Sequence, residues 1–270
     1  MKRPLLKYLF YATLLDAYQD YLYSDRIYSE YWGFSENPPM TEDEFHEKQR
    51  LSLLDRINRV PFDSEKADRG TAFNEIVDCL ILNRKSEKMQ VESIKTPSVN
   101  PDTKETEWRT TAIKATLNGR TFTFPVSICR EFSDYYKGAL PQVYTEAILP
   151  TVYGDVLLYG YLDELMPVSI HDIKTTTRYT AGKFRNHWQH IVYPYCLNKN
   201  GNEIQDFEYN ILLINEKKGG VTYETFTEHY SYLAGRDIPL LTKHVEDLIE
   251  FIDAHRDTIT DLKIFNKHEG

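Results

Sequence analysis

The sequence has only three cysteines among its 270 residues, and they lie far apart, at Cys79, Cys129 and Cys196. No two of them form the C-x-x-C pair that zinc sites and iron–sulfur clusters use, which argues against both kinds of site. A chain of this length buries a sizeable core without a disulfide scaffold. We therefore expect buried free thiols in a reducing compartment.

Long apolar runs are also missing, since no stretch approaches the ~20 apolar residues that span a bilayer. The N-terminus begins like a signal peptide, but tyrosine and aspartate interrupt its apolar run and no small-residue cleavage site follows. These absences predict a cytoplasmic protein that has no membrane partner.

Positive charge is in deficit, because 41 acidic residues outnumber 32 lysines and arginines and give a net charge of −9. This balance argues against a broad basic surface for nucleic acid. It does not exclude a nuclease, because a bound metal ion offsets the charge of clustered carboxylates, and an acidic protein can carry a local basic groove.

Hydrophobic periodicity predicts a mixed α/β fold with an N-terminal helical layer. Helices are expected over 5–32, 41–57, 70–83, 130–140 and 180–198, and from about Pro239 onward. Strands are expected over 120–129, 143–154, 155–165, 167–176, 206–217 and 220–230. Asn118-Gly119 predicts a hairpin turn, and Thr41 with Glu44 predicts a capping box. The tyrosines of 5–32 can pack in a core or stack on single-stranded bases.

The strand over 167–176 carries the chemistry. Asp172 and Lys174 share one of its faces, and Asp163, at the end of the preceding strand, can reach the same point across a hairpin. Asp-x-Lys alone is common and more typical of a surface ion pair than of a functional site. Two carboxylates, with the Ile173 carbonyl as a further ligand, suit Mg²⁺ or Mn²⁺. Lys174 can position or help deprotonate an attacking water and offset phosphate charge, so we predict a metal-dependent phosphodiester hydrolase.

The helix over 70–83 offers a further ligand. Its apolar stripe is bordered by Asn74 and Asp78, which lie one turn apart and can face one point, while Glu75 is expected to point further toward solvent. Taken alone, this segment is more typical of a solvated polar face.

Four motifs follow one another along the chain: Gly70-x3-Asn74-x3-Asp78, Gly160-Tyr161-Leu162-Asp163, Asp172-Ile173-Lys174 and Gln189-x3-Tyr193. Their order and spacing resemble the PD-(D/E)XK nuclease superfamily, and within it the RecB-like exonuclease branch of phage and recombination systems. The resemblance implies a restriction-endonuclease-like core, in which helices flank a central mixed β-sheet, within a single nuclease domain over 1–270. Its expected parts are an N-terminal helical region (1–60), an insertion or mobile loop (85–119), the catalytic sheet with the Gln-x3-Tyr helix (120–235) and a C-terminal helix (236–270).

The resemblance also implies roles for individual residues. Asp163 and Asp172 would bind Mg²⁺ or Mn²⁺, and Lys174 would be the catalytic lysine. Gln189 and Tyr193, which share a helix face, would contact the site or the DNA.

The branch usually has His or an acid where this chain has Asn74. An amide oxygen is a weaker ligand than a carboxylate, so Asp78 or Glu75 is an alternative source of the remaining metal ligand.

Four residues lie between the catalytic strand and the Gln-Tyr helix, namely Arg178, Lys183, Arg185 and His187, and they can form a local phosphate-binding patch or remain solvated charges. The expected partner is DNA. A single-strand annealing protein or a helicase often accompanies this branch, and a homo-oligomer around DNA is compatible with the sequence.

The leading hypothesis is thus a metal-dependent DNA nuclease, exonuclease rather than endonuclease. A second hypothesis is a catalytically degenerate protein of the same fold that binds DNA or a partner. A third is an unrelated α/β protein in which Asp-x-Lys occurs by chance. Convergence of Asp163, Asp172 and Lys174 on one point would reject the third hypothesis, and calorimetric titration with Mn²⁺ would separate the first two.

Overall fold

The structure is a computed structural model that describes residues 6–99, 102, 104–217 and 220–265. Its architecture is mixed α/β, which confirms the predicted fold class. The helices are α1 (Ala12–Leu22), α2 (Ser24–Trp32), α3 (Glu42–Ile57), α4 (Glu65–Ile81), α5 (Val126–Tyr135), α6 (Gln189–Lys199) and α7 (Ala234–Ala254). The strands are β1 (Leu6–Tyr11), β2 (Gln90–Val99), β3 (Thr106–Leu117), β4 (Arg120–Pro125), β5 (Leu140–Thr151), β6 (Gly154–Leu165), β7 (Ser169–Thr176), β8 (Asp206–Lys217) and β9 (Gly220–Ser231).

Strand β6 organises the larger, six-stranded sheet, whose order is β1-β6-β7-β8-β9 with β5 also paired to β6. β5 occupies one edge of β6 along its whole length, so β1 and β7 share the opposite edge. β1 pairs in parallel with 155–159, whereas β7 pairs only with Glu164 and Leu165. The shared edge is therefore unpaired at 160–163, between the end of β1 and the start of β7.

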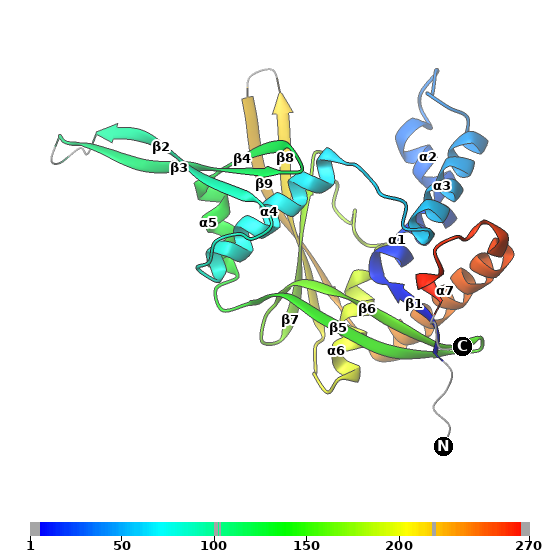
Figure 1. The fold of residues 1–270 in the computed structure, drawn as a ribbon. Coiled ribbons are helices and arrows are strands. Elements are labelled where there is room, and N and C mark those ends of the chain that lie inside the picture. Colours follow the sequence, from blue (N-terminus) through cyan, green and yellow to red (C-terminus); the bar gives the residue numbers. More distant parts are fainter. Residues whose placement is uncertain (1–5, 100–101, 103, 218–219, 266–270) are drawn as a thin grey trace.

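The two faces of this sheet carry separate cores. On one face α1, α6 and α7 pack around residues such as Leu158, Val192 and Leu248. On the other face α4, α5, β3 and β4 enclose a smaller core that includes Phe73 and Ile173. In Figure 1, α2 and α3 stand as a helical pair beyond one end of the sheet, and the β2–β3 hairpin projects from the opposite side.

The N-terminal prediction of one helix over 5–32 is wrong at its start and in its continuity. Leu6–Tyr11 is strand β1, and the helical part that follows is divided into α1 and α2 at Tyr23. Tyr8 and Phe10 alternate into the core, and pairing with β6 outweighs the helical spacing of the leucines. Of the tyrosines in this region, Tyr18 packs in the core, while Tyr31 is exposed.

Three other predicted boundaries also move. α4 begins at Glu65, five residues before the predicted start, because the Ser64 side chain accepts a hydrogen bond from the Ala67 N–H and caps the helix. Residues 126–129, predicted as strand, begin α5 directly after Pro125. The predicted helix over 180–198 is wrong before Gln189, where α6 starts.

The polar segment 85–119 contains strands β2 and β3, so the expectation of a loop is wrong there. Only the C-terminal half of β3 contributes residues to the core, namely Ile113 and Ala115. Strand β2 is exposed along nearly all of its length. A ribbon that is solvated on both faces lacks the alternation that marks a half-buried strand.

The predicted turn at Asn118-Gly119 is confirmed, and both residues have positive φ, of 51° and 77°. The capping box is confirmed as well, since Thr41 Oγ1 accepts from the Glu44 N–H and the Thr41 N–H donates to Glu44 Oε2. Within the described ranges, no helix combines the length and the apolar character needed to cross a membrane.

Candidate active site

The unpaired edge at 160–163 is where the predicted catalytic residues meet. Asp163 Oδ2 accepts a hydrogen bond from the backbone N–H of Ile173 at 2.9 Å and another from Asn74 Nδ2 at 3.0 Å. Strand β6, strand β7 and helix α4 each contribute one group to this contact. The ladder between β6 and β7 has ended here, so a carboxylate takes the place of the missing strand partner.

Asp172, Lys174 and Gln189 form a closed ring beside this contact. Lys174 Nζ lies 2.7 Å from Asp172 Oδ2 and donates to Gln189 Oε1 at 2.6 Å, while Gln189 Nε2 donates to Asp172 Oδ1 at 2.7 Å. Asp172 and Gln189 are buried, and Lys174 is only partly exposed. The first residue of α6 thus fixes the orientation of both charged side chains on β7.

The electrostatic surroundings shift the pKa values of Lys174 and Asp163, and these shifts set their protonation states. Burial alone would lower the pKa of Lys174, but the carboxylates of Asp172 and Asp163 offset it and raise the pKa above its usual range, so this lysine is a cation. Burial, reinforced by the Asp172 charge, raises the pKa of Asp163 to about 7. A neighbouring cation would favour the ionised form of Asp163. In this state Lys174 can position a water and balance charge, but it holds its proton.

Tyr193 lies one turn after Gln189 on α6 and is buried. Gly160 allows this position, because a Cβ on Gly160 would lie 2.7 Å from the Tyr193 ring. Tyr193 also lines a cavity of about 380 Å³ together with Tyr11, Arg59 and Tyr161. The Gln-x3-Tyr pair therefore lies beside Asp172 and Lys174.

Of the three candidate ligands on α4, Asn74 is the one that contacts Asp163. Its Nδ2 makes the hydrogen bond, and its buried Oδ1 has no partner among the described residues. Glu75 is directed elsewhere, since it binds Arg84 at 2.8 Å and Lys88 at 3.1 Å. The expectation that Glu75 points toward solvent is wrong, because only 2% of it is exposed. Burial would raise its pKa, but these two cations lower it to about 2.

Asp78, the third candidate, faces Glu164, a residue that the sequence analysis missed. Both carboxyl groups are buried, and among the described residues no N–H or O–H donor reaches Glu164. Burial and mutual repulsion raise the pKa of Glu164 to about 9, and burial raises that of Asp78 to about 6. The pair therefore shares a proton. Two consecutive acids in a strand, Asp163 and Glu164, were the available signal, because one of them has to face inward.

The predicted cationic residues Arg178, Lys183 and Arg185 are exposed in the non-helical segment 177–188. Lys183 Nζ donates to the Arg178 carbonyl at 2.7 Å and to Thr176 Oγ1 at 2.8 Å, which draws the segment into a tight turn. The structure thus gathers these cations on one exposed segment that leads from β7 to α6.

A divalent cation would find oxygen donors of the right kind here. No group of three or more His, Cys, Asp or Glu side chains in the described part of the chain is arranged to hold a metal ion. The reason is that α4 brings an amide to Asp163 and turns its acids away. Two carboxylates and the unpartnered Oδ1 of Asn74 are hard oxygen ligands, so the donor set fits Mg²⁺ or Mn²⁺ in chemical type.

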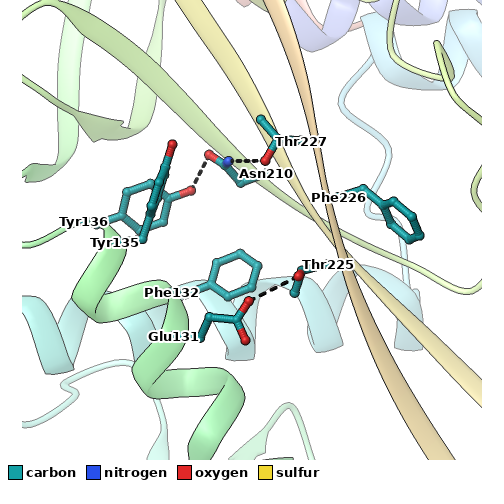
Figure 2. A pocket seen from close by; sticks show the side chains of 8 residues that line it. All are labelled: Glu131, Phe132, Tyr135, Tyr136, Asn210, Thr225, Phe226 and Thr227. Carbon is teal, nitrogen blue, oxygen red and sulfur yellow. Dashed lines mark hydrogen bonds between the residues drawn. The ribbon is translucent and has the colours of Figure 1, made fainter.

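A second polar cluster lies under α5, on the face of the sheet that α4 also covers (Figure 2). Asn210 Oδ1 accepts from the Tyr136 hydroxyl at 2.6 Å, and Asn210 Nδ2 donates to Thr227 Oγ1 at 3.2 Å. His171 and Glu208 complete the network around the same amide. The cavity of about 230 Å³ above it is lined by α5, β8 and β9.

The fold and this geometry define a mixed α/β protein with a buried Asp-Lys-Gln ring at an unpaired strand edge. No family model matches the chain, and no curated protein matches it. Among solved structures, the protein SSO0001 matches with a TM-score of 0.33 and 12% sequence identity, over 47% of this chain. The match covers 56% of the SSO0001 chain. So weak a likeness carries no weight for family or function.

Proposed function

We propose that this chain is a Mg²⁺- or Mn²⁺-dependent DNA nuclease, acting as an exonuclease, and that it belongs to the RecB-like branch of the PD-(D/E)XK superfamily. One observation carries the proposal: Asp163, Asp172 and Lys174 converge at 160–163, a stretch of the inner edge of β6 that neither β1 nor β7 pairs. A chance Asp-x-Lys on a solvated strand does not require Gln189 to hold both of its charges or Asp163 to cap its backbone.

The residues suggest a division of labour. Asp163, Asp172 and the Asn74 Oδ1 would hold the ion. The Ile173 carbonyl would join them, because within a strand a residue's C=O lies on the same edge as its N–H, which faces Asp163. When bound, the ion activates a water and neutralises phosphate charge.

Lys174 supplies the remaining positive charge. As a cation held by Asp172 and Gln189, it can orient the attacking water and stabilise the charge that develops on the scissile phosphate. The ring makes this geometry rigid before substrate arrives, which lowers the cost of reorganisation during the reaction.

DNA would follow the exposed cations Arg178, Lys183 and Arg185 toward this point. We place the protein in the cytoplasm, where an annealing protein or a helicase would supply the DNA end. The proposal of these partners depends on the same candidate active site.

The second candidate function is DNA or partner binding without hydrolysis. The observation that favours it is the hydrogen bond from Asn74 to Asp163, which occupies with a neutral amide the position where a third acidic ligand would stand.

Incubation of the purified protein with end-labelled linear DNA and Mn²⁺ tests the proposal. We expect nucleotide release that stops with chelator and is absent in Asp172→Ala. A circular duplex of the same sequence, which has no ends, should resist. If the wild-type protein binds DNA but releases no nucleotides with Mg²⁺ or Mn²⁺, the non-catalytic function replaces this one.

A further inference from the structure

Helix α1 brings two carboxylates to the pocket onto which Lys174 opens. This pocket, of about 300 Å³, lies between α1, α3, the end of β7 and the segment before α6, and its lining includes Asp16, Asp20, Arg56, Lys174 and His187. Neither α1 nor His187 belongs to the motifs that identified the site, so the pocket adds titratable groups that the proposed mechanism does not yet use.

His187 is held in this pocket from three sides. Its Nδ1 lies 3.4 Å from Asp16 Oδ2, within ion-pair distance. Its ring stands edge-on to Phe184 and to Tyr209, with centroids 5.1 Å and 6.1 Å apart. Asp16 is fixed in turn, because its Oδ1 accepts the backbone N–H of Trp188 at 2.5 Å. Asp16 and His187 therefore form an oriented dyad within this pocket.

The opposite ring nitrogen, Nε2, is free to act. None of the hydrogen bonds within the described residues engages it, and about a third of the side chain is exposed. A protonated imidazole carries an N–H on both nitrogens, so with Nδ1 facing Asp16 the Nε2–H is an available donor. Asp16 balances the positive charge of that form.

We propose that His187, oriented by Asp16, is the general acid that protonates the leaving oxygen in the phosphodiester hydrolysis proposed above. This inference rests on that function. In the step, a water oxygen forms the new bond to phosphorus and loses its proton to solvent. The bond from phosphorus to the bridging oxygen breaks, its electron pair stays on that oxygen, and the Nε2 proton of His187 passes to it.

The other charged groups around the ring are suited to different tasks. Lys174 is locked to Asp172 and Gln189, and Arg56 is a guanidinium that keeps its proton. Asp20, whose pKa burial raises, lies near His187 and adds negative charge. His190, on α6, is neutral, because burial lowers its pKa to about 4. Among the groups that line this pocket, His187 is the best suited to donate a proton, because it is partly exposed and the Asp16 carboxylate orients it.

A change of leaving group tests this role. Products of unmodified DNA first identify which bridging oxygen leaves, and a second substrate then carries sulfur at that one position, because a thiolate leaves without protonation. Single-turnover rates with Mn²⁺ are compared for the wild type, His187→Gln and His229→Gln. His229 is the matched control, since it is an exposed histidine that pairs with Asp206 at 3.2 Å.

We expect His187→Gln to cleave the oxygen substrate about 100-fold more slowly than wild type and the sulfur substrate within about threefold of wild type. His229→Gln should match wild type on both. Equal losses on both substrates would show that His187 only binds or positions the phosphate and would overturn the proposal, as would full activity of His187→Gln. A wild-type protein that cleaves neither substrate would instead refute the nuclease function itself.

Discussion

Two buried polar clusters lie against the same sheet, and they differ in how completely their atoms are paired. Around Asn210, the amide oxygen and nitrogen both have partners, supplied by Tyr136, His171, Glu208 and Thr227. Around Asp163, buried polar atoms of three neighbouring residues have no hydrogen-bond partner within the described chain. These residues are Asn74, Asp78 and Glu164.

The difference separates a structural network from a candidate site. A satisfied buried network stabilises one packing arrangement, whereas an unsatisfied buried group costs free energy and persists where a ligand or a proton completes it. Lys174 sharpens the contrast, because burying an ammonium group beside two carboxylates contributes little to stability compared with a well-packed apolar side chain. Mutations in the two clusters should accordingly affect different observables.

The largest effect is expected at Lys174. Lys174→Met keeps the length of the side chain and removes its charge, so nuclease activity should fall by at least about 100-fold. The fold should survive, as a melting curve and circular dichroism would show. Lys137→Met is the matched control, since this exposed lysine follows α5 and lies outside both the ring and the segment 177–188, and it should retain most activity. Comparable losses in both variants would contradict the assignment of Lys174.

Asn210 should show the reverse behaviour. Asn210→Ala leaves a tyrosine hydroxyl, a histidine and a threonine without their partner, and we expect a loss of about 2–3 kcal/mol in unfolding free energy. Activity below the melting temperature should be unchanged. Asn215→Ala is the control, because its exposed amide bonds only Glu224, and its cost should stay within about 0.5 kcal/mol. A drop in activity without loss of stability would make the Asn210 cluster functional.

Glu164 should give a pH-dependent effect of intermediate size. Its folded pKa, about 9, lies above the unfolded value, so the stability it contributes is complete below about pH 4.5 and declines as the pH rises toward 9. Glu164→Gln keeps a hydrogen-bond donor for Asp78 but does not ionise. Denaturant titrations should find the variant more stable than wild type at pH 8, by on the order of 1 kcal/mol, and little different at pH 4. Equal curves at both values would contradict the shared proton.

The smallest effect is expected at the exposed cations. Replacing Arg178, Lys183 and Arg185 together by glutamine should weaken DNA binding at all sequences alike. It should also reduce the slope of log K against log salt by up to about three. Fluorescence anisotropy measures this change in DNA affinity when the salt concentration is varied from about 50 to about 200 mM. An unchanged slope would place the DNA path elsewhere.

Much of the fold was predictable from sequence, because strand alternation in 143–176 and 206–230 and the stripes of the main helices reflect burial on one face. The parts that were not predictable depend on partners distant in sequence. β1 is a strand because β6, about 150 residues later, offers an open edge. The β2–β3 ribbon has no buried face along most of its length and so leaves no alternating pattern.

The candidate site was predictable where its residues share one strand or one helix turn. Asp172 with Lys174 and Gln189 with Tyr193 are such pairs. The direction of Glu75 was not, because Arg84 and Lys88, beyond the end of the helix, turn it away. His187 and Asp16 come together from segments 171 residues apart, and no local pattern signals their contact.

Calorimetric titration of Mn²⁺ into the wild-type protein and Asp172→Asn tests most directly whether the unsatisfied cluster is a metal site. We expect saturable binding to the wild type that Asp172→Asn loses while its fold persists. Binding should be unaffected in Asn210→Ala at a temperature where that variant is folded. The absence of saturable binding to the wild type, or equal binding to Asp172→Asn, would contradict the assignment of a metal site.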